Sequence, residues 1–505
     1  MTTVWIGIDI GTSACKVVAV DPAGQVVADR SQAYPLATPR PGWAEQDPAD
    51  WWRVTDECVR AVVAAVPGAQ VRGIGLCGQM HGLTALDEGG QVIRPAILWN
   101  DQRSAPQCDE ITERAGGLKG LLGLTQNRML PGFTGGKLLW LRQHEPEAYA
   151  RMRHMLNPKD YLRLRMTGDY VTDVSDASGT GLFDVRNRRW SSELLGLLDI
   201  PERLLPRVVE SAEITGQVSA EVARSWGVPA GTPVVGGGGD AVLQTTSMGV
   251  VGGGVVGVTL GTAGIIGGAS GSCPSEPDGR LQISCGNAPD RWHVMGVALN
   301  AGGAFQWLRT ALRPLLPDGD LDYAKLVELA QQAPPGSEGL LFLPYLVGER
   351  CPHLAPDARG SWVGLSPRHS AAHLSRSVLE GTLFNLREIS AVFADVGVAS
   401  NRVRVSGGAT VEPLWLRLLA DILQTEVVPV VGAEHGGAFG AALLAGVGTG
   451  NWSGLEAATA VVRETNPTTP DTSLADRYDG LYRIHRELFT ALEPTFAELA
   501  AVEPA

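Results

Sequence analysis

The chain has 505 residues, of which 44% are apolar, and its mean hydropathy of +0.03 is near zero; this is enough for two or more buried cores, and no run of about 20 apolar residues predicts a membrane span. A net charge of −13 without a run of Lys and Arg argues against nucleic acid and anionic membranes as partners. The seven cysteines are an odd number without C-x-x-C or zinc-ligand spacing, and the N-terminus lacks the basic and apolar regions of a signal peptide, so we expect a cytoplasmic protein with reduced thiols.

Helical and strand spacings of apolar residues alternate along the chain, which predicts an α/β protein. The first expected elements are two strands, 4–10 and 16–20, joined by the tight turn Gly11-Thr12-Ser13. Backbone N–H groups in such a turn can point together at a phosphate, and the hydroxyls of Thr12 and Ser13 add donors. Asp9 ends the first strand beside this turn, where its carboxylate suits contact with Mg²⁺. An ordinary hairpin is the alternative interpretation of this pattern alone.

Polar residues follow the ends of two further apolar runs. The run 71–76 is followed by Cys77-Gly78-Gln79-Met80-His81-Gly82, and Ile97-Leu98 is followed by Trp99-Asn100-Asp101. Because α/β sheets usually bind ligands beyond their strand ends, both segments are candidates for a binding site. For His81, a hydrogen bond within the core or a loop remains the alternative.

Four glycines, 236–239, follow Val234-Val235 and precede Asp240. We expect these glycines to leave a substrate unobstructed and Asp240 to act as a general base, with a structural cap as the alternative for this carboxylate. The glycine-rich stretch 249–257 then predicts a boundary between two domains, 1–248 and 249–505.

A second hairpin repeats the first one. Residues 256–263 (VGVTLGTA) match residues 6–13 (IGIDIGTS) at seven of eight places if Ser13 and Ala263 count as equivalent, and only Asp9 against Thr259 changes chemical class. The hydroxyl of Thr262 adds a phosphate donor in the second turn. The repeat predicts two copies of one fold facing a shared cleft, with a phosphate-binding turn in each.

The second half continues with a strand at 403–406, a glycine turn at 407–409 and a helix at 413–423. The last expected helix runs from about 476 to 499, and we expect its apolar stripe to pack on the C-terminal domain. This stripe consists of Tyr478, Leu481, Ile484, Leu488 and Leu492.

Other nucleotide and metal motifs are excluded. No G-x-x-x-x-G-K-[ST] motif exists, because Leu138 follows Gly136-Lys137 and Pro131 takes the place of the first glycine. His369 and His373 have a spacing that can bind metal, but no nearby acid completes a site, so a solvated helix face is expected. Phosphoryl transfer by a protein without the G-x-x-x-x-G-K-[ST] motif remains as an interpretation. It needs Mg²⁺ to neutralise the phosphates and a proton acceptor for the attacking hydroxyl.

The ordered set of motifs resembles the FGGY carbohydrate kinases over essentially the whole chain, and within that family it is most similar to the bacterial xylulokinases. The motifs are residues 6–13, 43–48, 78–82, 95–101, 158–163, 237–240, 260–262, 342–346 and 348–350. The resemblance implies two ribonuclease H-like domains, as in actin and hexokinase, with ATP and sugar in the cleft between them. It also implies phosphorylation of D-xylulose to D-xylulose 5-phosphate in pentose catabolism.

The resemblance also implies roles for individual residues. Asp240 would accept the proton, and Asp9 would contact Mg-ATP. The sugar would be bound by Met80, His81, Trp99, Asp101 and Arg103. The phosphates would meet Gly11, Thr12, Ser13, Gly261 and Thr262, and the adenosine would meet Gly407, Gly408 and Ala409.

Three positions depart from the family pattern: Ala241 stands where Asn is usual, Thr410-Val411-Glu412 replaces a common Arg-Ser pair, and Cys351 replaces Thr. The alternatives are therefore a kinase for ribulose, gluconate or glycerol, a non-catalytic sugar sensor, and an actin-like ATPase. A homodimer is the assembly considered, although the sequence does not determine it.

Overall fold

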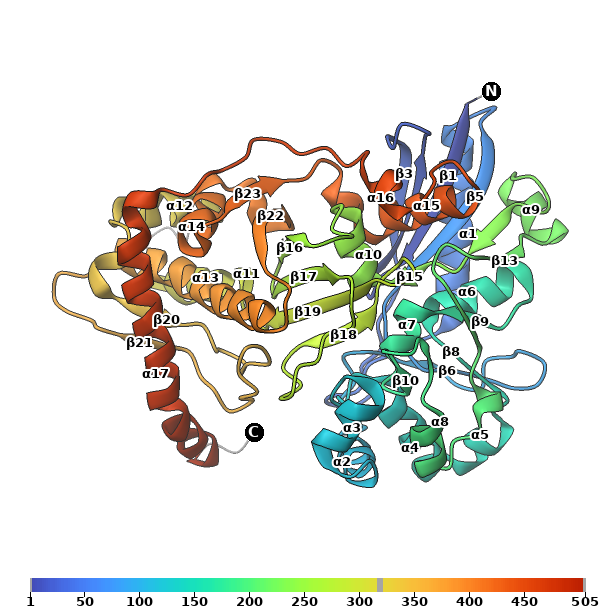
Figure 1. Ribbon diagram of the computed structural model, residues 1–505, viewed down its shortest axis with the longest axis horizontal. Helices are drawn as coiled ribbons and strands as arrows, with labels where there is room; N and C mark the ends of the chain where they lie inside the picture. The colour runs from blue at the N-terminus through green and yellow to red at the C-terminus, as the bar shows by residue number, and fades with distance from the viewer. Residues whose placement is uncertain (1, 316–320, 503–505) are drawn as a thin grey trace. The chain divides into compact units, whose positions relative to one another are not determined.

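The computed structural model describes residues 2–315 and 321–502 (Figure 1), and these residues form two compact units. The first unit contains the residues up to Gly252, together with Ala269–His293 and Glu434–Arg463. The second contains Gly253–Gly268, Val294–Ala433 and the residues from Glu464 on. The domain boundary between residues 248 and 249 stays a prediction. In the structure, the two later segments 269–293 and 434–463 pack with the first unit.

The first unit is built on a sheet with the strand order β13-β14-β5-β1-β2-β3, in which β15 also pairs with β5. The predicted hairpin is confirmed as β1 (Thr3–Ile10) and β2 (Ala14–Val20), which are antiparallel. β3 (Val26–Ala33) continues the sheet beside β2. On the other side, β5 (Gln70–Gly78) runs parallel to β1, and β14 (Pro233–Val235), β15 (Gly238–Gly239) and β13 (Ile214–Gln217) follow.

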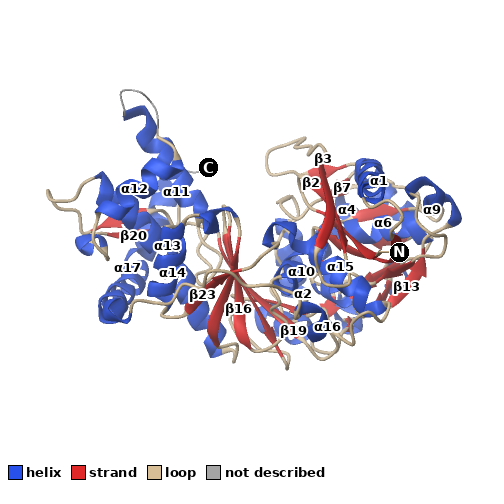
Figure 2. Ribbon diagram, turned by 90° about the horizontal axis from the view of Figure 1, so that it is seen from above, coloured by secondary structure: helices blue, strands red, loops and turns tan. Residues whose placement is uncertain are grey.

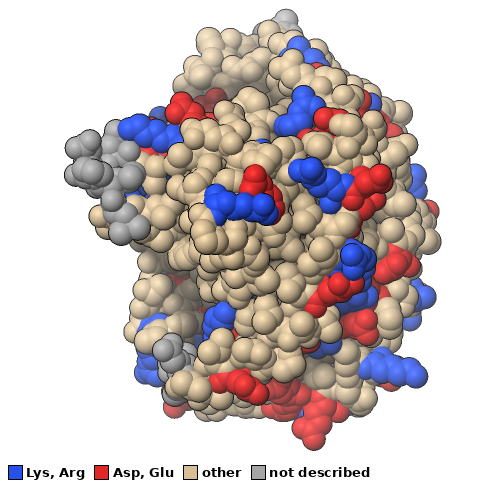
Figure 3. All heavy atoms as spheres, turned by 90° about the vertical axis from the view of Figure 1, so that its left-hand side faces the viewer, with Lys and Arg blue, Asp and Glu red and all other residues tan. Residues whose placement is uncertain are grey.

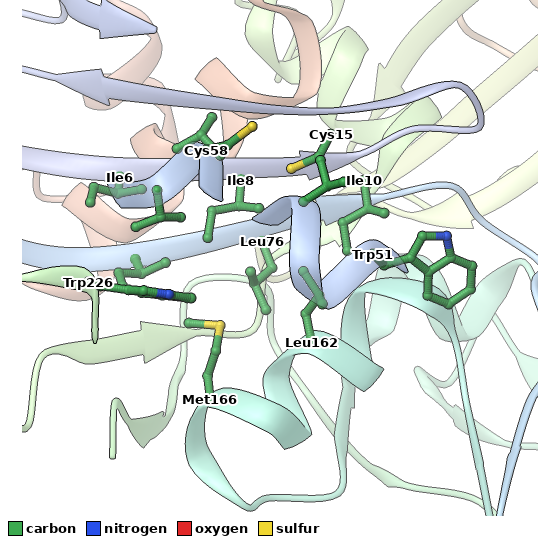
Figure 4. Close-up of a cluster of buried hydrophobic side chains, with 14 of the residues drawn as sticks. Ile6, Ile8, Ile10, Cys15, Trp51, Cys58, Leu76, Leu162, Met166 and Trp226 are labelled. Carbon is green, nitrogen blue, oxygen red and sulfur yellow. The ribbon is translucent and has the colours of Figure 1, made fainter. Parts of the chain in front are cut away.

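Successive side chains of β1 point to opposite faces of this sheet. Figure 4 shows Ile6, Ile8 and Ile10 in one core with Leu76 and Trp51. This face is covered by α1 (Pro48–Ala65), which begins at the predicted N-cap Asp47, and by α6 (Pro158–Thr167). Residues 7 and 9 of β1 belong to the other face, because successive side chains of a strand point to opposite sides.

That other face is covered by α15 (Gly436–Gly448), which packs on β1 and β5 (Figure 1). Figure 2 shows α15 beside α10, which it also contacts. The approach is so close that a Cβ atom on Gly7 would lie 1.8 Å from the carbonyl oxygen of Ala438, and one on Gly75 would lie 1.9 Å from that of Ala441. Gly7, the second residue of the repeated motif, therefore leaves room for this helix. This contact also explains why residues 434–463 belong to the first unit.

Short helices occupy the rest of the first unit. They are α2 (Ala105–Arg114), α3 (Gly117–Thr125), α4 (Thr134–His144), α5 (Pro146–Arg151), α7 (Val174–Ser178), α8 (Ser192–Leu197), α9 (Ala220–Trp226) and α10 (Asp240–Ser247). Among the described residues, no helix is long and apolar enough to cross a membrane.

The second unit repeats the strand pattern of the first. β16 (Gly254–Leu260) is antiparallel to β17 (Gly264–Ser270) and parallel to β22 (Ser400–Ser406), and β23 (Glu426–Pro429) follows. The internal repeat is thus confirmed in topology. The main helices are α11 (Gly302–Leu312), α12 (Tyr323–Gln332), α13 (Ala371–Asp395), α14 (Pro413–Leu423) and α17 (Ala475–Val502).

The predicted packing of the last helix, α17, on this unit is confirmed, with a correction to its buried stripe. The hydroxyl of Tyr478 donates to Glu380 Oε1 at 2.9 Å, and Phe489 packs in a core with Leu343. The buried stripe of α17 contains Tyr478, His485 and Phe489. Ile484, which was predicted to be in the stripe, is exposed.

Charged side chains of both signs lie interspersed on the face drawn in Figure 3, without one continuous basic area there. In the second unit, Arg387 of α13 pairs with Asp479 of α17, and Arg483 pairs with Glu487 within α17. Ion pairs at the surface contribute only about 0–1 kcal/mol each, so these pairs add little to the stability of the fold.

Candidate active site

Asp9 lies at the end of β1, on the face covered by α15. A Cβ atom on Gly437 would lie 3.1 Å from Asp9 Oδ2, which places the carboxylate at the N-terminal end of α15. Burial raises the pKa of Asp9, and a hydrogen bond with the Cys77 thiol and the charge of Lys16 oppose this rise. Asp9 Oδ1 is buried without a hydrogen-bond partner among the described residues, so one oxygen remains for a ligand.

Asp240 is the first residue of α10. Strand pairing brings it toward Asp9, because Gly238 of β15 and Asp9 of β1 are both register partners of Cys77 on β5. The pKa of Asp240 is raised to about 7, mainly by burial and next by the charge of Asp9, while backbone hydrogen bonds from Ala241 and Met80 oppose the rise. The Ala241 N–H donates to Asp240 Oδ1 at 2.8 Å. The two predicted carboxylates are therefore neighbours within the first unit.

The four glycines before Asp240 do not form an open path for a substrate, which corrects our expectation. A Cβ atom would lie 2.5 Å from the Glu210 carbonyl oxygen at Gly236, 2.1 Å from the Leu76 carbonyl oxygen at Gly237, 2.5 Å from Asn287 Nδ2 at Gly238 and 2.5 Å from Met80 Cγ at Gly239. Gly237 also has a positive φ of 73°. The protein packs tightly around this segment, so a side chain at any of these four positions would clash with neighbouring protein atoms.

Met80 and His81 follow β5 and lie near the same segment. The Met80 side chain is 5% exposed and lies between Gly179 and Gly239, close to both. His81 has a positive φ of 71°, its ring stacks on Phe133 at a centroid distance of 4.5 Å, and its Nδ1 lies 2.5 Å from the Gly179 carbonyl oxygen. Since a carbonyl only accepts, Nδ1 carries the proton in this arrangement.

A buried lysine that our sequence interpretation missed fixes the backbone of His81. Lys137 of α4 is fully buried, and its Nζ donates to the carbonyl oxygens of His81 at 2.7 Å and Gly132 at 2.6 Å. Thr134 adds a third donor, also to the His81 carbonyl, at 3.1 Å. Burial lowers the pKa of Lys137 to about 7. The signal in the sequence was a lone lysine before the apolar run Leu138-Leu139-Trp140-Leu141.

The predicted sugar contacts Trp99, Asp101 and Arg103 fall into two groups. Trp99 is 44% exposed, and its Nε1 donates to Thr12 Oγ1, in the turn between β1 and β2, at 2.8 Å. Asp101 is fully buried and accepts two hydrogen bonds from the Arg103 guanidinium, at 2.9 and 2.8 Å. Asp101 therefore orients Arg103, whose Nη1 has no hydrogen-bond partner in the described part of the chain.

The second unit contains the other turn. The backbone N–H groups of Ala301 and Gly303 donate to the Thr262 carbonyl at 2.8 and 3.0 Å, and that of Gly302 donates to the Gly261 carbonyl at 2.8 Å. The N-terminus of α11 thus fixes the backbone of this turn, while the Thr262 side chain stays exposed.

Gly407 follows β22, beside this turn in the sheet. Its φ is 99°, and a Cβ atom there would lie 2.4 Å from the Leu260 carbonyl oxygen. At Gly408 no atom lies within 4 Å of such a Cβ, so the space beside Gly408 is open on that side. At the position equivalent to Asp9, Thr259 Oγ1 shares a hydrogen bond with Ser406 Oγ at 2.9 Å.

The residues present suit a magnesium ion that arrives with a nucleotide. Within the described residues, no group of three or more His, Cys, Asp or Glu side chains could hold a metal ion. Mg²⁺ in such sites is usually bound by one or two carboxylates, phosphate oxygens and water. The unpaired Oδ1 of Asp9, with Asp240 nearby, fits that ligand pattern.

Comparison with known proteins matches both halves of the chain. Residues 4–248 match the N-terminal domain of the FGGY family of carbohydrate kinases, and residues 256–449 match its C-terminal domain. The xylulose kinase of Escherichia coli K12 is 37% identical over 98% of this chain and 100% of its own length. The gluconokinase of Bacillus subtilis 168 is 30% identical over 99% of this chain and 98% of its own length.

Solved structures agree with these sequence matches. The crystal structure of xylulose kinase from Rhodospirillum rubrum aligns with a TM-score of 0.91 and 33% identity, covering 97% of this chain and 99% of that one. The resemblance drawn from the motifs and the two-domain fold of the actin and hexokinase type are confirmed.

Proposed function

Because the chain belongs to the FGGY family of carbohydrate kinases, we propose that it transfers the γ-phosphoryl group of ATP to the terminal primary hydroxyl of D-xylulose, giving D-xylulose 5-phosphate and ADP. The observation that carries the proposal is the buried Asp240, whose pKa of about 7 suits a general base at neutral pH. The choice of D-xylulose is supported by the relative of that name, which is 37% identical over nearly the whole chain.

In this reaction Asp240 accepts the proton of the hydroxyl as its oxygen attacks the γ-phosphorus. The bond between that phosphorus and the β,γ-bridging oxygen breaks, and its electron pair leaves with ADP. Mg²⁺, when bound, neutralises charge on the phosphates. Asp9 is the residue that we propose to hold it, because one of its buried oxygens lacks a protein partner.

The remaining site residues keep their predicted roles as proposals. In the first unit, Met80, His81, Trp99, Asp101 and Arg103 bind the sugar, and Gly11, Thr12 and Ser13 bind phosphate. In the second unit, Gly261 and Thr262 bind phosphate, and Gly407, Gly408 and Ala409 bind the adenosine. We also propose a cytoplasmic location and a homodimer.

Gluconate is the second candidate substrate. A gluconokinase is 30% identical over 99% of this chain, and Ala241 follows Asp240 where xylulokinases usually have Asn. A sugar sensor or an actin-like ATPase is less well supported, because neither requires a neighbouring carboxylate pair whose pKa values are raised by burial.

A panel of D-xylulose, D-ribulose, D-gluconate and glycerol in a coupled ADP-release assay tests the proposal. We expect the highest kcat/KM with D-xylulose, and a higher value with D-gluconate would overturn that choice. Asp240→Ala should lower kcat by about 10²- to 10⁴-fold while ATP still binds. Retention of more than about a tenth of the wild-type rate would show that Asp240 is not the base.

A further inference from the structure

A buried polar network lies directly beneath the glycine segment that precedes Asp240. It is formed by residues of α6, of the strand β9 (Val171–Asp173) and of α7, and α7 lies close to β15 in Figure 1. At its centre Lys159 Nζ lies 2.6 Å from Asp160 Oδ1, 3.0 Å from Asp173 Oδ1 and 3.3 Å from Asp176 Oδ2. All four side chains are fully buried. Removing charged groups from water costs free energy, which interactions with the surrounding structure must offset.

One end of the glycine segment is bound by Arg163, a fully buried residue of α6. Its Nη1 donates to the Val235 carbonyl at 2.8 Å, and its Nη2 donates to the Gly236 carbonyl at 2.6 Å. Nη1 also donates to Thr215 Oγ1 at 2.5 Å. The planar guanidinium therefore fixes two successive peptide groups where β14 enters the glycine segment.

The other end is bound by Ser175 of α7. The Gly239 N–H, one residue before Asp240, donates to Ser175 Oγ at 3.1 Å. Ser175 Oγ in turn donates to Asp173 Oδ2 at 2.6 Å, and the other oxygen of Asp173 faces Lys159. The network therefore contacts backbone groups at both ends of the segment 236–239, whose glycines permit this close approach.

We propose that Arg163 and Ser175 are positioning residues for the proton acceptor: together they fix both ends of the segment 236–239 and thereby the place of the Asp240 carboxylate beside Asp9. The proposal rests on the proposed function of Asp240. Both side chains act through the backbone, because they hydrogen-bond the carbonyl oxygens of Val235 and Gly236 and the Gly239 N–H. A displacement of about 1 Å at a reacting group can lower the rate by about 10²-fold, so backbone anchoring of this kind affects kcat.

The experiment compares Ser175→Ala with Ser178→Ala. Both hydroxyls lie on α7, and both accept one backbone N–H, from Gly239 at 3.1 Å and from Cys285 at 3.0 Å. Only Ser175 contacts the glycine segment. We expect Ser175→Ala to lower kcat by about 10-fold, with little change in the KM for ATP, and Ser178→Ala to have little effect on kcat at a similar Tm.

A second readout is the titration of the Asp240 carboxyl, followed by carbon-13 NMR in protein labelled at aspartate. Loosening the segment admits water to the carboxylate and moves it relative to Asp9, so Ser175→Ala should shift this titration to lower pH. Arg163→Lys keeps the charge but loses the forked pair of hydrogen bonds and should have the same effect. Arg165→Gln, an exposed site on the same helix, should not.

The outcomes separate the two proposals. If the wild-type protein phosphorylates no sugar, the proposed function fails, and the NMR titration still decides the positioning role. If Ser175→Ala and Arg163→Lys leave both kcat and the titration of Asp240 unchanged, the positioning role is wrong even if Tm falls, because Tm alone reports a structural contribution.

Discussion

The negative charge of Asp9 raises the pKa of Asp240, second only to the burial of Asp240 itself. The two residues are 231 positions apart in the sequence, and pairing with β5 brings them together, because Asp9 and Gly238 are both register partners of Cys77. The charge of Asp9 therefore helps to set the ionisation of Asp240. The protein can accept a proton at Asp240 near neutral pH while Asp9 offers a free oxygen to a cation.

The pH dependence of the reaction follows from this pair. A general base works only when deprotonated, so kcat should rise with pH through about 7, the pKa of Asp240, and level off above it. Asp9→Asn removes the second cause of the shift, so Asp240 should then titrate at lower pH. Carbon-13 NMR of the carboxyl measures this without activity, and Asp21→Asn, at an exposed turn, is the control. Titration of Asp240 below pH 5 in the wild type would contradict the assignment.

The same shift has a consequence for stability. Between about pH 4, the usual aspartate range, and about pH 7, folded Asp240 keeps a proton that the unfolded chain has released. Stability from this group therefore falls as pH rises through that window and stays low above it. Asp240→Asn should raise Tm by a few degrees at pH 8 and leave it nearly unchanged at pH 4. Equal gains at both pH values would assign the effect to packing.

The sequence was sufficient for the hairpins, because a glycine turn between alternating apolar residues specifies β1-β2 and β16-β17 locally. The divergence of the copies was also visible: Asp9 keeps a carboxylate, whereas Thr259 pairs with Ser406 at 2.9 Å. The reasons for individual glycines were not visible. Gly7 is required by Ala438, more than 400 residues away in the sequence, and an apolar helix such as α15 carries no mark of the sheet that it covers.

The buried charges were equally hidden. Lys137, Lys159 and Arg163 are fully buried, and composition predicts such residues on the surface. Several partners lie far along the chain, namely the His81 carbonyl for Lys137 and the Val235 and Gly236 carbonyls for Arg163, and only the fold brings them within reach. Sequence motifs located the candidate catalytic and binding groups, whereas the groups that fix their geometry required the structure.

Gly237→Ala tests the packing of the glycine segment. The added Cβ would lie 2.1 Å from the Leu76 carbonyl oxygen at a φ of 73°, so we expect a loss of more than about 2 kcal/mol in the free energy of unfolding. Gly196→Ala on α8, where nothing lies within 4 Å, is the matched change and should be neutral or stabilising by about 0.5–1 kcal/mol. Urea unfolding measures both, and equal effects would contradict the close packing.

Lys137→Met tests the support of His81. The variant keeps the length of the side chain but removes both donors, which leaves Thr134 alone on the His81 carbonyl. Because His81 is a proposed sugar contact in a left-handed conformation, the KM for the sugar should rise by about 10-fold, the cost of one lost hydrogen bond of about 1.4 kcal/mol, with the KM for ATP unchanged. Lys119→Met on the exposed side of α3 is the control. An equal rise in both KM values would point to a general loss of structure.

The hydrogen bond from Trp99 Nε1 to Thr12 Oγ1, at 2.8 Å, joins a proposed sugar contact to a proposed phosphate contact within the first unit. If the bond matters for catalysis, Trp99→Phe and Thr12→Val should act non-additively, because either change alone already breaks it. A double-mutant cycle on kcat/KM measures the coupling, which for residues in contact is about 0.5–3 kcal/mol. Trp99→Phe combined with Lys119→Met, a change on an exposed helix face, should be additive. Additivity in the Trp99–Thr12 cycle would mean that the two residues serve their ligands independently.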